Sequence, residues 1–171
     1  MKATILGLTV AACLALGASA AEVTISDVHL CCKSCVTGAE KAVTSVSGAK
    51  ATVSQDEETV KITAADKATL QKAADALVAA GFFGKSSDAD IKIKADTGAM
   101  NMKSQKVTIT GVHLCCTKCV NAVDKVVKSV PGTTGNTAKK DAKSFEVTGD
   151  FNDKDLMDAF QKAGLTGKVT M

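Results

Sequence analysis

The cysteines are the most reactive residues of this chain, and six of the seven fall into two copies of one motif. Residues 31–35 read Cys-Cys-Lys-Ser-Cys, and residues 115–119 read Cys-Cys-Thr-Lys-Cys. The flanking residues repeat as well, so residues 28–36 match residues 112–120 at an offset of 112 − 28 = 84. A repeat of this length is typical of a duplicated domain, because solenoid units mostly span about 20–50 residues.

Two cysteines separated by two residues can direct their thiolates at a single ion. Soft sulfur ligands favour ions such as Cu(I), Zn(II) and Hg(II) over hard cations. The pairs Cys32/Cys35 and Cys116/Cys119 are therefore candidate metal ligands, one pair in each copy. The sequence predicts up to two soft-metal sites per chain.

Both motifs stand where a strand pattern changes into a helix pattern. Val23/Ile25 and Val107/Ile109 alternate with polar residues, which is the period of a half-buried strand. After the motif, apolar residues recur at i, i+3, i+7 and i+10, one face of an amphipathic helix. They are Val36, Ala39, Val43 and Val46 in the first copy and Val120, Val123, Val127 and Val130 in the second. A helix start stabilises thiolates through its free N–H groups and positive dipole end.

The remainder of each copy predicts a hairpin, a second helix and a last strand. The second helices end in similar glycine-containing segments, residues 79–85 and 162–168. The order strand, helix, strand, strand, helix, strand predicts an α+β fold of two tandem ferredoxin-like βαββαβ sandwiches. In the first copy, the last strand follows Gly84 or contains Ile91 and Ile93. We place the first domain at residues 21–95, a linker at 96–104 and the second domain at 105–171.

Residues 1–20 have the composition of a secretory signal peptide. Lys2 precedes an apolar stretch from Ile5 to Leu16, and small residues end at Ala20. The stretch is shorter than the roughly 20 residues of a membrane span, so no span is expected in the mature chain. We predict a periplasmic or secreted protein; a lipoprotein with Cys13 at its N-terminus is the alternative.

The composition argues against nucleic-acid binding. The formal charge is +3, all basic residues are lysines, and there is neither tryptophan nor tyrosine. Arginine forks for base recognition and most stacking aromatics are therefore missing. Six cysteines in an oxidising compartment would ordinarily indicate disulfides, but their placement in the two motifs favours metal binding.

The two copies resemble the heavy-metal-associated domain family, which includes copper chaperones and periplasmic mercury-binding proteins. The family pattern Gly-Met-Thr/His-Cys-x-x-Cys aligns with Cys32/Cys35 and with Cys116/Cys119, and Leu30 and Leu114 stand at its methionine position. The resemblance covers nearly all of the mature chain. It implies the same fold, reversible binding of a soft cation and handover to a partner such as a metal transporter, without catalysis.

Both copies depart from that pattern in the same way. His29 and His113 replace the family's glycine, while Cys31 and Cys115 replace its threonine or histidine. An additional thiolate and an imidazole could build a three-sulfur or a Cys₃His site, and Cys₃His is a common zinc arrangement. Zinc and cadmium thus rival copper and mercury. The alternatives are a buried thiol for each cysteine and a surface position for each histidine.

Two further points stay open. Phe82 and Leu165 stand in the segment that faces the metal in this family, as an apolar lid or as plain core, and core packing is favoured. Met100 and Met102 are expected to be inert in a flexible linker.

Two other functions compete with metal binding. One is a thiol–disulfide redox protein, because Cys-x-x-Cys at a helix start is also a redox motif. The other is a disulfide-bonded structural module.

Overall fold

Two four-stranded antiparallel sheets make up the computed structural model, which describes residues 20–170. The first contains β1 (Ala21–Ser26), β2 (Lys50–Ser54), β3 (Thr59–Ala64) and β4 (Lys85–Ser86), with helices α1 (Lys33–Thr44) and α2 (Lys67–Ala79). The second contains β5 (Lys103–Thr110), β6 (Thr133–Asn136), β7 (Ser144–Asn152) and β8 (Lys168–Thr170), with helices α3 (Thr117–Ser129) and α4 (Asp153–Lys162).

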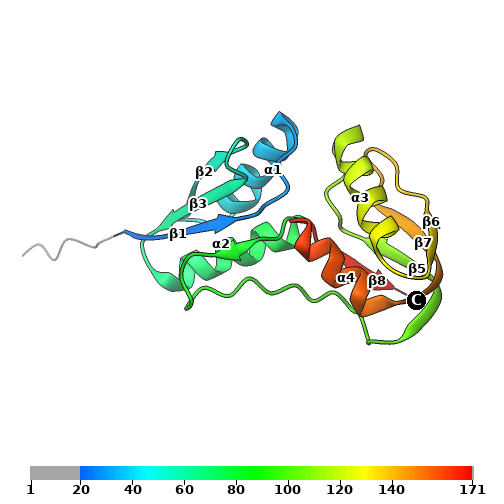
Figure 1. Ribbon diagram of the computed structural model, residues 1–171. Coiled ribbons are helices and arrows are strands. Elements are labelled where there is room, and N and C mark those ends of the chain that lie inside the picture. The colour runs from blue at the N-terminus through cyan, green and yellow to red at the C-terminus, as the bar shows by residue number, and fades with distance from the viewer. Residues whose placement is uncertain (1–19, 171) are drawn as a thin grey trace, which may run out of the picture.

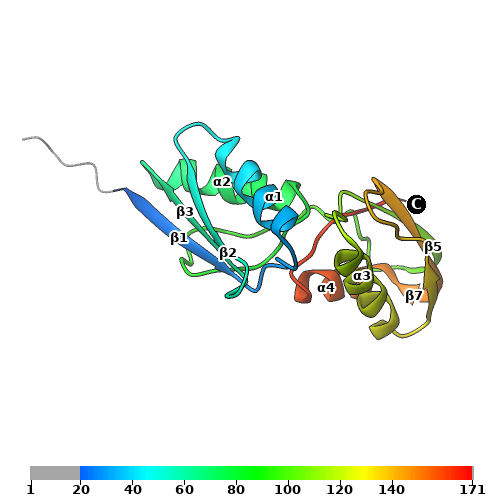
Figure 2. The same cartoon turned by 90° about the horizontal axis from the view of Figure 1, so that it is seen from above.

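Strand order identifies the fold of each half. The orders β2-β3-β1-β4 and β6-β7-β5-β8 are the same arrangement, with all strand pairs antiparallel. Two helices cover one face of each sheet, and the two halves lie side by side (Figures 1 and 2). The predicted α+β fold of tandem ferredoxin-like sandwiches is confirmed.

The core of each half lies between its sheet and its two helices. In the first half, Val23 and Ile25 of β1 pair with Ile62 and Val60 of β3, and all four are buried. This is the alternation expected when one face of a sheet packs against helices.

The buried stripe of the first helix differs by one position from the predicted one. Cys35, Ala39 and Val43 are the buried residues of α1, at i, i+4 and i+8, whereas Val36 and Val46 are half-buried. In α3, Cys119 is likewise fully buried and Val120 is not, whereas the predicted core residues of this copy, Val123, Val127 and Val130, are buried. The last cysteine of each motif therefore belongs to the core, and the core fixes its position.

Gly84 is followed directly by the last strand of the first half. Strand β4 pairs with β1 at Ser26 and Ile25, while Ile91 is buried outside any strand. Strand β5 begins at Lys103, inside the range 96–104 expected to be a linker. The domain boundaries themselves stay predictions.

The segment between the halves is held against the second half, contrary to the expected flexible linker. The buried carboxylate of Asp153 accepts hydrogen bonds from the N–H groups of Met100 (2.9 Å) and Met102 (2.8 Å). Val169 N–H donates to the carbonyl of Thr97 at 2.7 Å. The Met100 and Met102 side chains are nevertheless exposed. Figure 1 shows this segment running beneath both halves before it enters β5.

The predicted signal peptide, residues 1–20, and Cys13 lie almost entirely outside the described residues. Among the helices of residues 20–170, none is both long and apolar enough to cross a membrane.

Candidate metal centre

Each cysteine motif spans the junction between a strand and a helix. Cys32 is the N-cap of α1 and has an extended backbone, and Cys116 is its counterpart at α3. Cys35 and Cys119 follow in the first helical turn and are fully buried. The other four cysteines of the two motifs are half-buried. Because the buried cysteines are packed into the two cores, both loops present their sulfurs at fixed positions.

The two motifs meet, so that six free cysteines from both halves form one cluster. Nine pairs of sulfur atoms lie 3.4–3.7 Å apart, and five of these pairs join one half to the other. Within the motifs, Cys32 and Cys35 are 3.6 Å apart and Cys116 and Cys119 are 3.7 Å apart. We call this set the cysteine cluster: Cys31, Cys32, Cys35, Cys115, Cys116 and Cys119.

The sulfur spacing suits thiolates that share metal ions. A metal–thiolate bond of about 2.3 Å places two thiolates about 3.8 Å apart at tetrahedral angles and about 4.0 Å apart at trigonal angles. The observed separations of 3.4–3.7 Å are a few tenths of an ångström shorter. A disulfide would need a sulfur–sulfur bond of about 2.05 Å. Small side-chain rotations therefore suffice for metal binding.

Two reciprocal backbone contacts hold the loops together. Gly81 has φ +89°, and a Cβ there would collide with the backbone of Gly111 and His113. Gly164 has φ +73°, and a Cβ there would collide with the backbone of Asp27 and His29. Each glycine thus lets the end of one half's second helix press against the other half's cysteine loop. Only glycine combines this backbone conformation with so close an approach.

The segments that contain these glycines also pair with each other. Phe82 and Leu165 form an isolated antiparallel bridge. Phe83 N–H donates to the carbonyl of Gly164 at 3.1 Å, and Thr166 N–H donates to the carbonyl of Gly81 at 3.1 Å. The two halves therefore join through backbone hydrogen bonds between segments that also contact the chain just before each cysteine motif. Sequence reasoning noted the repeated glycine segments but missed this role; their matched Ala-Gly-Phe and Ala-Gly-Leu sequences were the available signal.

Phe82 forms a wall beside the second cysteine loop and is completely buried. Its ring centroid lies 4.6 Å from that of His113 in the other half. Leu165 is also buried. The two residues are core residues, as favoured from the sequence, and Phe82 additionally shields one histidine.

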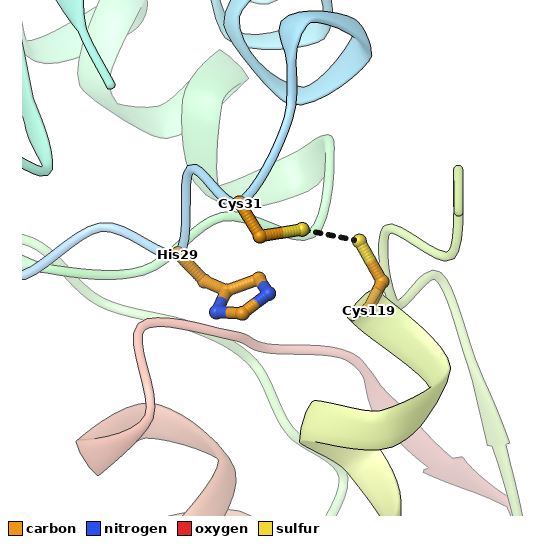
Figure 3. A group of neighbouring side chains, drawn as sticks. All are labelled: His29, Cys31 and Cys119. Atoms are coloured by element: carbon orange, nitrogen blue, oxygen red, sulfur yellow. Dashed lines mark hydrogen bonds between the residues drawn. The ribbon is translucent and has the colours of Figure 1, made fainter. Parts of the chain in front are cut away.

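The histidines lie in the interface between the halves. His29 has a ring nitrogen within 4.8 Å of the sulfurs of Cys31 and Cys119, and Figure 3 shows its ring beside this pair. His113 packs on Phe82, and its imidazole only partly offsets the rise in the pKa of Cys35 that the Cys119 thiol and burial cause. The Nε2 atoms of both histidines are buried and have no hydrogen-bond partner among residues 20–170. Buried polar atoms are rarely left unpaired, so each imidazole nitrogen is available to bind a metal ion or, as N–H, to donate a hydrogen bond to a thiolate.

The cysteine cluster contains two kinds of thiol. Burial raises the pKa of Cys31 to about 12, and burial also raises the pKa of Cys115. Burial opposes ionisation at Cys32 and Cys116 as well, but the helix N–H groups of Cys35 and Cys119 together with contacts from neighbouring thiols outweigh it, so both pKa values are lowered. The N-cap thiols therefore ionise first, and the motif's first cysteines ionise only when a cation is present.

The buried thiols Cys35 and Cys119 restrain each other. Contact with Cys119 and burial together raise the pKa of Cys35. At Cys119 the contact with Cys35 acts in the opposite sense, but burial and the nearby thiols leave its pKa raised. Two adjacent buried sulfurs cannot both carry a charge without a compensating cation.

Comparison with solved structures gives likenesses at low identity. The N-terminal domain of PacS from Synechocystis PCC6803 is 18% identical over 40% of this chain and 100% of its own, with a TM-score of 0.35. The N-terminal soluble domains of Bacillus subtilis CopA are 16% identical over 90% of this chain and 95% of their own, with a TM-score of 0.34. The first two RRM domains of yeast poly(U) binding protein are 8% identical over 88% and 98%, with a TM-score of 0.28.

No family model and no curated protein matches the chain. TM-scores this low do not indicate a function. The resemblance to the family therefore depends on the strand order and the cysteine loops of this chain itself. Both halves resemble heavy-metal-associated domains. Each has the βαββαβ order, with the Cys-x-x-Cys pair at the junction between first strand and first helix that the resemblance implies.

Proposed function

We propose that this chain binds soft metal ions reversibly through the cysteine cluster and passes them to a metal-accepting protein. The observation that carries the proposal is the convergence of six free cysteines, from two motifs 84 residues apart, on one small volume. Thiols that lie this close together and are partly buried are stable only when they are protonated or when metal ions neutralise the charge of the thiolates. We propose one ion for each Cys-x-x-Cys pair, and no catalytic turnover.

The ions that suit the cluster are those that favour sulfur. Cu(I), Zn(II), Hg(II) and Cd(II) bind thiolates readily, and three sulfurs per ion are available if Cys31 and Cys115 take part. His29 and His113 could complete a fourth position, because their Nε2 atoms are buried and unpartnered. A Cys₃His set is a common arrangement for zinc.

The proposed setting is the periplasm or the extracellular space, and this depends on residues 1–20 alone. Lys33 and Lys118 lie exposed in the first turns of α1 and α3, beside the cysteines. Their charge favours docking with an acidic surface on the acceptor, for instance a metal transporter. Ligand exchange during such a contact would release the ion without leaving it free in solution.

A thiol titration of the mature chain tests this proposal. Protein purified under reducing conditions is divided, loaded with Zn(II) or left metal-free, and reacted with a thiol reagent in native buffer. The proposal predicts six free thiols in the metal-free protein, counted after unfolding in denaturant, and protection of the accessible thiols in native buffer in proportion to the bound metal. Cysteines already paired in disulfides would favour the structural module. Thiols that are rapidly oxidised and then reduced again by a dithiol, and that metal does not protect, would favour the redox protein.

A further inference from the structure

The sulfur positions assign each metal ion a ligand from the opposite half, an inference that rests on the proposed function. Cys31 lies 3.5 Å from Cys116 and 3.4 Å from Cys119, both in the second half. Cys115 lies 3.5 Å from Cys32 and 3.4 Å from Cys35, both in the first. The additional cysteine of each motif thus contacts both members of the other motif's pair.

The six sulfurs can be divided into two groups of three in several ways. Only the crossed division gives two groups in which every sulfur contacts both others at 3.4–3.7 Å. Among the nine contacts, Cys32 touches only Cys35 and Cys115, and Cys116 touches only Cys119 and Cys31. Any ion held by a Cys-x-x-Cys pair therefore finds its third contacting sulfur in the other half. The resulting triads are Cys32, Cys35 and Cys115 in one case, and Cys116, Cys119 and Cys31 in the other.

The uncrossed arrangement is looser. Cys115 contacts Cys119 at 3.7 Å, but the triad Cys115, Cys116 and Cys119 closes only within a limit of 4.8 Å. Likewise, Cys31 is 3.7 Å from Cys35 of its own motif and 3.4 Å from Cys119 of the other. His29 of the first half also lies beside a crossed pair, because its ring nitrogen is within 4.8 Å of the sulfurs of Cys31 and of Cys119 in the second half.

We propose that metal binding links the two halves covalently through two crossed three-thiolate sites. At each site a divalent ion displaces three protons and forms three metal–sulfur bonds, so that M²⁺ and three thiols become an M(thiolate)₃ unit of charge −1 and three H⁺. Because each unit draws on both halves, loading fixes their relative position. Release to an acceptor then requires one crossed bond to break, after which the ion remains on a Cys-x-x-Cys pair whose first cysteine, Cys32 or Cys116, is half-buried.

The deciding experiment uses two triple variants that contain the same number of cysteines. The Cys32→Ser/Cys35→Ser background retains one pair, Cys116/Cys119, together with both additional cysteines. Either Cys31→Ser or Cys115→Ser is then added, and Cd(II) is bound under reducing conditions. Cadmium-edge absorption measures the sulfurs per ion, and competition with a chelator measures affinity.

The crossed pairing predicts three sulfurs per cadmium in the variant that retains Cys31. The variant that loses Cys31 is expected to fall to two sulfurs and to bind Cd(II) more than about tenfold more weakly, since even outer partners of a metal site cost that much. The reverse order, or equal losses in both variants, would overturn the crossed pairing. Absence of cadmium from the background itself would instead count against the proposed function.

A mirrored set guards against a variant that fails to fold. In the Cys116→Ser/Cys119→Ser background, Cys115→Ser is expected to remove the third sulfur and Cys31→Ser to leave it in place. Far-ultraviolet circular dichroism of every variant verifies the sheets and helices. Agreement between the two sets supports crossing, whereas a loss that always follows the additional cysteine of the retained motif refutes it.

Discussion

The sulfur of Cys31 lies 3.4 Å from that of Cys119, a residue of the other half, and 3.7 Å from that of Cys35 in its own motif. The two halves are therefore joined at their cysteine loops rather than merely connected by a linker. Backbone hydrogen bonds between the glycine segments maintain this arrangement. The predictions below follow from it.

The first prediction concerns the number of ions. The Cys32→Ser/Cys35→Ser variant is expected to bind one soft metal ion fewer than the wild type and to keep the other, because each pair is the minimal set for one ion. Native mass spectrometry with Zn(II) measures the stoichiometry. Exchange of both exposed lysines, Lys33→Ala/Lys118→Ala, provides the control, with unchanged stoichiometry. If the cysteine variant bound as many ions as the wild type, the two-site description would be wrong.

The second prediction concerns the contact between the halves. Gly164→Ala is expected to destabilise the protein by about 1–3 kcal/mol through its positive φ alone, and to separate the cysteine loops because the new Cβ meets the backbone at His29. Denaturant unfolding measures the first effect, and the sulfurs per bound metal ion measure the second.

Two other glycines separate strain from collision. Gly111 also has a positive φ, +78°, but a Cβ there would meet nothing within 4 Å, and Gly135 has neither feature. Gly111→Ala should lose stability yet keep three sulfurs per ion, and Gly135→Ala should change neither. An unchanged sulfur count in Gly164→Ala would show that this contact does not set the site.

Much of this architecture is predictable from sequence because it is local. The alternation in β1 and β5, the helical apolar spacing after each motif, and the Cys-x-x-Cys pairs all report on their own half. The predicted helix stripes are largely buried, but each begins one residue earlier than predicted. The cysteine at the start of each helix is itself a core residue, whereas apolar periodicity was counted from Val36 and Val120.

The approach of one loop to the other was not predictable in the same way. It depends on contacts between residues such as Gly81 and Gly111, which no periodic pattern connects. The contacts of residues 96–104 were not predictable for a similar reason, because a single buried carboxylate, Asp153, accepts hydrogen bonds from the backbone of Met100 and Met102. Asp153 is also the first residue of α4, and nothing in the sequence indicated that its carboxylate would bind the backbone of the preceding segment.

The third prediction tests that carboxylate. Asp153→Ala is expected to lower the free energy of unfolding by about 1–3 kcal/mol, because two N–H groups lose their acceptor. Asp155→Ala, in the same helical turn but exposed, is the matched control and should have a much smaller effect. Denaturant unfolding compares the two, and equal losses would contradict the proposed tether.

The fourth prediction concerns pH. Burial lowers the pKa of His29, although the charge of Glu58 acts against it. A depressed pKa in the folded state means that the neutral ring contributes stability above the unfolded value of about 6.5, which is lost as pH falls through the lowered folded value. Metal-free wild type should therefore lose stability below about pH 6.5, and His29→Asn should lose less. Parallel stability curves would contradict burial of the neutral ring.

The fifth prediction is the metal-bound counterpart. Metal must displace protons from the thiols, so affinity should rise with pH throughout the range of about 5 to 8. If the histidines bind the ion, their neutral form is required, and the wild type should lose further affinity in the lower half of that range. The His29→Ala/His113→Ala variant should lack this additional loss. Superimposable affinity curves would leave the site to sulfur alone.

Metal-edge absorption of the wild-type chain, loaded with one ion per Cys-x-x-Cys pair, tests the account most directly. Participation of Cys31 and Cys115 predicts three sulfurs per ion at about 2.3 Å for zinc. Ions bound by only two sulfurs, or by oxygen and nitrogen without sulfur, would contradict the shared cysteine cluster.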